Sequence, residues 1–218
     1  SLNHLGPKGR PCGRPVPAVV IIVVARLDAL AKAAEGALVR DEDSVALLSA
    51  MNSAVKHTVR TNLYVERRWA LTLRIDPVFF SDVLHKLPSS KGLKSNMPYG
   101  VFFVAGRHFN GYHVRFSNIA RGGLRVVLPP SHDTHVAETR RHFNETFRLA
   151  WAQQLKNKDI PEGGAKAVCL VYPVAGQRRE RLMHKCVKKI TDALLDLICP
   201  RQQLRLSTDG LTVRGADP

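Results

Sequence analysis

The sequence lacks several features that would narrow its function at once. Its four cysteines form no Cys-x-x-Cys pair, so we expect reduced, buried thiols in an intracellular protein. No apolar run reaches the ~18 residues of a membrane span. The longest is Val16 to Ala25, whose length fits a signal-sequence core or a buried strand equally well. None of the 15 glycines forms the Gly-x-Gly-x-x-Gly pattern of a dinucleotide-binding turn.

Acidic residues are also scarce. The chain has 18 Asp and Glu against 33 Lys and Arg, a formal charge of +15 over 218 residues. Such a balance favours nucleic acid, an anionic surface or anionic substrates as partners, without choosing among them. It would also arise if the acidic part of a longer polypeptide lay elsewhere. The hydrophobic content of 44% is typical of a folded domain.

The hydrophobic pattern predicts an α/β domain with a mixed sheet and flanking helices. Period-two alternation and short apolar runs predict strands, and a period of 3.6 predicts helices. We expect a poorly defined segment over 1–40, one domain over 41–200 and a tail over 201–218, with a polar loop at 89–96. The expected helices are 41–59, 132–155 and 177–198, and the expected strands are 69–75, 99–106, 111–118, 124–130 and 167–173.

Two glycine pairs stand beside basic residues, in ARGGLR and in EGGAK. Each pair adjoins an expected strand, and ligands bind at strand ends in α/β sheets. We therefore expect Arg121, Lys156 and Lys166 to line one cleft that suits a small dianion. Burial and neighbouring cations lower the pKa of a lysine, so Lys166 on its glycine loop could act as a base or form a Schiff base. The alternative is a solvated lysine on an ordinary turn.

Two long stretches carry a family resemblance. The segments FFVAGRHFNGYHVRFSNIARGGLRVV, 102–127, and LAWAQQLKNKDIPEGGAKAV, 149–168, resemble the glutamate dehydrogenases, and most of all their large-subunit, NAD-specific branch. The resemblance covers roughly Val45 to Pro200. It implies the fold of the family's substrate-binding domain, with the dinucleotide-binding domain missing from this chain.

The resemblance also implies residue roles. Arg121 stands where the family grips a substrate carboxylate, Lys156 where a second lysine binds the other carboxylate, and Lys166 at the catalytic lysine that helps water attack the imine formed from glutamate. Lys158 is a rival to Lys156, because the loop is shorter than in small-subunit enzymes. Four glycines would lie beside the substrate: Gly122, Gly123, Gly163 and Gly164.

For the complete enzyme the resemblance implies NAD as cofactor, L-glutamate and 2-oxoglutarate as substrate and product, a homo-oligomer, and a mitochondrial or cytoplasmic location. We expect this chain alone to bind no cofactor and no metal, and to partner neither nucleic acid nor membrane. The alternative function is a non-catalytic basic module that binds nucleic acid or serves in assembly.

Two other clusters could either bind a ligand or be ordinary features of a helix. His132, His135 and His142 could form a metal site, but a helix start with Ser131 as N-cap and Asp133 in the first turn explains the segment better. The basic run 178–189 could follow a nucleic acid, but it is better explained as the solvated face of an amphipathic helix.

Overall fold

The computed structural model describes residues 42–63, 65, 68–81, 97–156 and 159–199. Several predictions fall outside these residues: those for the segments 1–40, 89–96 and 201–218, for Cys12 and for Lys158. Among the described helices, none combines the length and apolar character needed to cross a membrane.

The described part is built on a seven-stranded sheet. Its strand order is β1-β2-β3-β4-β7-β5, and β6 also pairs with β7. The neighbours from β1 to β7 are antiparallel, whereas β5 and β6 both run parallel to β7. The strands are β1 Thr58–Thr61, β2 Leu71–Ile75, β3 Gly100–Gly106, β4 Phe109–Arg115, β5 Ala120–Arg121, β6 Leu124–Val127 and β7 Gly163–Val171.

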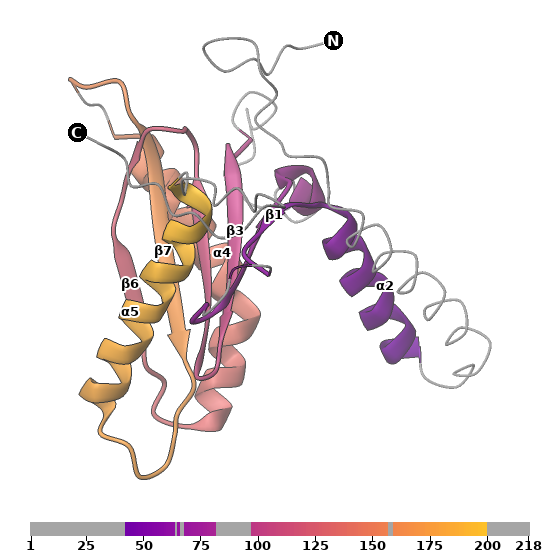
Figure 1. Cartoon of the computed structure of the whole chain (residues 1–218), viewed down its shortest axis with the longest axis vertical. Helices are drawn as coiled ribbons and strands as arrows, with labels where there is room; N and C mark the ends of the chain where they lie inside the picture. Colours follow the sequence, from indigo (N-terminus) through magenta and orange to yellow (C-terminus); the bar gives the residue numbers. More distant parts are fainter. Residues whose placement is uncertain (1–41, 64, 66–67, 82–96, 157–158, 200–218) are drawn as a thin grey trace, which may run out of the picture.

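Two long helices cover opposite faces of this sheet. Helix α4, His132–Gln154, packs Phe147 on one face, in a cluster with Val114 and other buried side chains. Helix α5, Arg179–Ile198, packs Ile190 on the other face, in a cluster with Phe109. Figure 1 shows the two helices on either side of the strands. This arrangement confirms the predicted mixed sheet with flanking helices.

The long helices begin and end close to the predicted residues. Ser131 caps α4, because its hydroxyl accepts a hydrogen bond from the Thr134 amide while the Thr134 hydroxyl accepts one from the Ser131 amide. This reciprocal pair satisfies donors that an uncapped helix would leave open. Asp133 lies in the first turn, where the helix dipole favours an acidic side chain. The predicted N-cap and first turn are therefore confirmed.

Helix α2, Glu42–Lys56, is shorter than predicted. The prediction ran to residue 59, but Thr58 and Val59 belong to β1. These two β-branched residues favour an extended chain, and pairing with β2 overrides the helical pattern. In Figure 1 α2 extends away from the sheet, and its Met51 is 53% exposed.

Strand β7 begins earlier than predicted. The sequence suggested a strand from Ala167 preceded by a glycine loop, but the strand starts at Gly163 and contains Lys166. Gly163 donates its amide to the Ile119 carbonyl at 2.8 Å, and Phe116 donates to the Gly164 carbonyl at 3.0 Å. These ladder bonds outweigh the low strand propensity of glycine. The lysine therefore lies on a strand, and the prediction of a glycine loop was wrong.

Candidate active site

Three segments meet at the start of β7. Arg121 in β5 is paired with Gly164, and Lys156 lies two residues beyond the end of α4. The Nζ atom of Lys166 lies 3.8 Å from the place where a Cβ on Gly123 would sit. The structure thus places the two glycine pairs and the three cations at one end of the sheet.

Lys166 is the one residue of β7 that is not fully buried. It lies opposite the buried Val114 of β4, and Val114 belongs to the cluster packed under α4. Cross-strand partners point to the same face, so the lysine side chain emerges on the α4 side of the sheet. Within the part of the chain that the structure describes, its ammonium group makes no hydrogen bond or ion pair. It is therefore available to a ligand.

The guanidinium group of Arg121 contacts main-chain carbonyls. Its Nη1 donates to the Glu162 carbonyl at 3.0 Å, and its Nη2 donates to the carbonyls of Gln153 at 2.8 Å and Lys156 at 3.0 Å. Its Nε lies 3.6 Å from the Glu162 carboxylate, and the side chain is 17% exposed. Arg121 thus joins the end of α4 to the residue before β7.

Lys156 contributes to this junction through its main chain. Its amide donates to the Gln153 carbonyl at 3.3 Å, and its own carbonyl accepts from Arg121. Its side chain is exposed. The ammonium group is therefore accessible to a charged ligand.

Three of the four predicted glycines allow close contact between chain segments. A Cβ on Gly122 would lie 1.7 Å from the Ala165 carbonyl oxygen, and one on Gly164 would lie 2.1 Å from the Gln154 nitrogen. A Cβ on Gly163 would likewise lie 2.5 Å from that of Ser117. Gly123 differs, because a Cβ there would meet only the lysine Nζ, at 3.8 Å. Of the four, Gly123 is the one whose missing side chain leaves room beside the amine.

Sequence reasoning missed His113, which lies on β4 opposite Ala167. Its ring lies 5.6 Å from that of Phe102 between centroids, and neither ring nitrogen has a well-aligned hydrogen-bond partner. Burial, and then the positive charge of Arg115, lower the pKa of His113 to about 4, and the main chain of Lys166 offsets this only in part. A lone histidine in an alternating strand gives no sequence signal for such burial.

Two of the three histidines of the possible metal cluster pack in the interior. The His142 Nε2 lies 3.0 Å from the Val168 carbonyl, and burial lowers the pKa of His142. His135 packs its ring on Tyr172 at 4.5 Å between centroids, and His132 is exposed. In the described ranges no group of three or more His, Cys, Asp or Glu residues is placed to hold a metal ion.

The cysteines differ from one another in exposure. Cys169 and Cys186 are buried free thiols, as predicted, but Cys199 at the end of α5 is exposed. Burial, and then the neighbouring Cys186, raise the pKa of the Cys169 thiol to about 12. Cys199 escapes burial because α5 ends there, beyond the edge of the core that holds Leu197.

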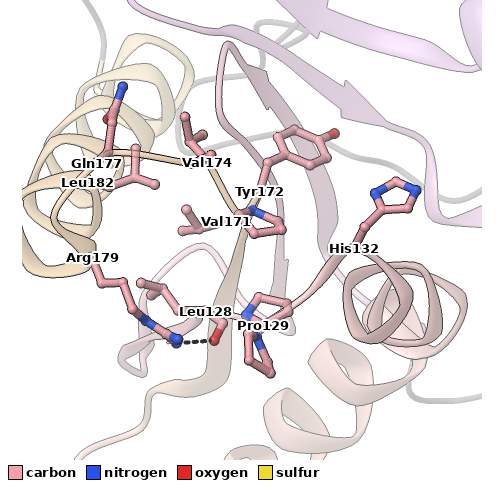
Figure 2. A pocket seen from close by; sticks show the side chains of 12 residues that line it. Leu128, Pro129, His132, Val171, Tyr172, Val174, Gln177, Arg179 and Leu182 are labelled. Carbon is pink, nitrogen blue, oxygen red and sulfur yellow. Dashed lines mark hydrogen bonds between the residues drawn. The ribbon is translucent and has the colours of Figure 1, made fainter.

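A separate pocket lies at the other end of β7. Figure 2 shows it between the segment after β6, the end of β7 and the start of α5, with the Arg179 guanidinium donating to the Leu128 carbonyl at 2.7 Å. Its volume is about 360 Å³ and its lining is mostly apolar. It contains none of the residues predicted for the site, so it is not the cleft expected from the sequence.

Comparison with known proteins shows the family. Residues 31–210 match the family model for the catalytic domain of bacterial NAD-glutamate dehydrogenase. The chain belongs to this glutamate dehydrogenase family. It is 34% identical over 158 residues to the NAD-specific glutamate dehydrogenase of Saccharomyces cerevisiae, which covers 72% of this chain and 14% of the relative.

Two further glutamate dehydrogenases are similar to an equal degree. Glutamate dehydrogenase 2 of Dictyostelium discoideum is 36% identical over 166 residues, 76% of this chain and 15% of the relative. The NAD-specific glutamate dehydrogenase of Neurospora crassa is 37% identical over 149 residues, 68% of this chain and 13% of the relative. The predicted family is confirmed, and the chain spans about a seventh of the length of these relatives.

Proposed function

We propose that this chain carries the glutamate-binding site and the catalytic lysine of an NAD-specific glutamate dehydrogenase. In the complete enzyme the reaction is the oxidative deamination of L-glutamate to 2-oxoglutarate and ammonia. The observation that carries the proposal is the position of Lys166. Its half-buried amine lies against Gly123 and has no described partner, in a chain whose family is glutamate dehydrogenase.

The proposed site offers two lysine side chains to a dianionic substrate. The exposed ammonium of Lys156 binds one carboxylate as a charge-assisted hydrogen-bond donor. Lys166 lies deeper, and its amine would take a proton from the water that adds to the reacting carbon. The open backbone at Gly123 leaves room for the substrate next to the amine. The chain segments around this space pack closely, because the other three glycines carry no Cβ: Gly122, Gly163 and Gly164.

NAD belongs to the proposed activity of the complete enzyme, since the relatives are NAD-specific by name. The residues described here do not fit that cofactor. No described strand leads through a glycine-rich turn into a helix N-terminus, the arrangement that holds a dinucleotide pyrophosphate. We therefore assign NAD binding to another part of the complete enzyme, and we derive no step of the reaction through it. A homo-oligomer and a mitochondrial or cytoplasmic location remain proposals for that enzyme.

Titration of residues 1–218 with 2-oxoglutarate tests the proposal, with amide signals followed by NMR. We expect shifts at Gly122, Gly123 and Gly164. Lys166→Ala should weaken binding roughly tenfold, the effect of losing one hydrogen bond to a charged group. Lys185→Ala removes an exposed lysine of α5 and serves as the matched control. Absence of shifts at the glycines, or equal weakening by both variants, would contradict the proposal.

A further inference from the structure

Arg121 has little capacity left to bind a carboxylate. A guanidinium group carries five N–H donors, and in Arg121 three of them are used: one on Nη1 for Glu162, and both on Nη2 for Gln153 and Lys156. A bidentate grip on a carboxylate needs two parallel N–H groups. Both such pairs include Nη2, either with Nε or with Nη1. Because both Nη2 hydrogens point at carbonyls, neither pair is open.

One of the carbonyls that Arg121 binds, that of Gln153, belongs to the last turn of α4. The last carbonyls of a helix have no partner within it, and the helix dipole favours a cation beside them. Helix α4 has no basic residue in its own last turn, so Arg121 supplies that cation from β5. The same guanidinium bonds the Glu162 carbonyl directly before β7. One side chain therefore bonds both the end of α4 and the residue directly before β7.

The two lysines of the proposed site adjoin the segments that Arg121 joins. Lys156 is itself bonded through its carbonyl, and Lys166 follows Glu162 by four residues along a regular strand. Gln154 reinforces the junction, because its Oε1 accepts the Gly164 amide at 2.6 Å. The separation of the two lysines thus depends on how α4 is fixed to β7.

We propose that Arg121 is a positioning residue that clamps the end of α4 to the start of β7. In this role Arg121 sets the separation of Lys156 and Lys166. It does not contact the substrate carboxylate directly, which is the role that the family resemblance implies. The inference rests on the proposed function for what the two lysines bind. The clamp itself is visible without any ligand, so it can be tested separately.

Hydrogen exchange in the ligand-free protein tests the clamp. The Gly163 and Gly164 amides are bonded at this junction. Arg121→Gln and Arg121→Lys should speed the exchange of these two amides about tenfold or more. Neither replacement side chain can donate to three carbonyls, and the loss of one net hydrogen bond corresponds to about that factor. The control is Arg125→Gln, which removes an exposed arginine paired with Glu145 outside the junction. Unchanged exchange in both Arg121 variants would overturn the inference.

Ligand binding separates positioning from direct contact. If Arg121 positions the lysines, the guanidinium NMR signals of Arg121 stay in place when 2-oxoglutarate shifts the Gly123 amide. Arg121→Lys then weakens 2-oxoglutarate and the monocarboxylate 2-oxobutyrate by the same factor. Movement of the guanidinium signals, or a selective loss of the dicarboxylate, would overturn the proposal.

A double-mutant cycle separates positioning from a purely structural role. The loss of 2-oxoglutarate affinity caused by Lys166→Ala should shrink by more than half when Arg121→Gln is already present, because the lysine is then misplaced. A full, additive loss would mean that Arg121 supports folding alone and would overturn the inference. If the unmodified chain binds no 2-oxoglutarate at all, the proposed function fails, and the exchange result still decides the clamp.

Discussion

The burial of His113 makes the stability of the domain depend on acid pH. The pKa of the ring falls from its ordinary 6.5 to about 4. The unfolded chain therefore binds a proton before the folded domain does. Well above pH 6.5 the ring is neutral in both states and does not affect stability, and the free energy of unfolding falls progressively as the pH drops from 6.5 to 4. The full effect is about 3 kcal/mol below pH 4, at 1.36 kcal/mol per unit of pKa difference.

Most of this loss falls in an accessible range. Between pH 7 and pH 5 the same two pKa values give a loss of about 2 kcal/mol in the free energy of unfolding. His113→Phe removes the titrating group and keeps an aromatic ring against Phe102. We expect this variant to lose about 2 kcal/mol less than the unmodified chain over that interval. His184→Gln, which replaces an exposed histidine of α5, serves as the matched control.

Urea unfolding followed by far-UV circular dichroism at several pH values measures these differences. The buried His135 and His142, whose pKa values are also lowered by burial, supply the pH dependence that remains in the variant. Equal losses in His113→Phe and the unmodified chain between pH 7 and pH 5 would refute the reasoning. So would an NMR titration of the His113 ring with a midpoint above pH 6.

Three further predictions concern packing, activity and thiol chemistry. Gly122→Ala should lower the free energy of unfolding by about 2–3 kcal/mol, because its Cβ would meet the Ala165 carbonyl. Gly123→Ala should change the free energy of unfolding by less than about 1 kcal/mol. Equal losses for the two variants in urea unfolding would contradict this prediction. Residues 1–218 alone should form no NADH from glutamate and NAD at 340 nm, and turnover near 1 per second, ordinary for an enzyme, would contradict it. A maleimide at pH 7.5 should label the exposed Cys199 and spare the buried Cys169, and peptide mass mapping that finds both labelled in the folded protein would be the opposite result.

Most of the fold could be predicted from local pattern. The capped start of α4, with Ser131 and Asp133, is written in adjacent residues, and so is the amphipathic face of α5 around Ile190. The start of β7 could not be predicted, because Gly163 and Gly164 gain strand geometry from β5 and from the chain after β4. Such partners are distant in sequence, and glycine's own propensity points the other way.

The sequence predicted that Arg121 and Lys166 would lie near each other, but not how their side chains would be directed. The motifs named Arg121, which pairs with the start of β7 from β5, and Lys166, which lies in β7 itself. Nothing in the sequence showed that Arg121 would be directed at carbonyls of α4, since that depends on where the helix ends relative to the sheet. The burial of His113 likewise depends on Phe102 of the neighbouring strand. Contacts between segments, rather than local propensity, decide both.

The position of Lys166 on a strand makes the length of its segment matter as much as its composition. Side chains alternate between the two faces of a sheet, so Ala167 and Cys169 share the α5 side while the lysine faces α4. Deleting one residue between Glu162 and Lys166 would shift the strand by one place and carry the amine toward the apolar layer under α5. Deleting two would restore its face but draw it about 7 Å along the strand, away from Gly123. Insertions and deletions here should therefore be tolerated far less well than single substitutions, and an even number should be tolerated better than an odd one.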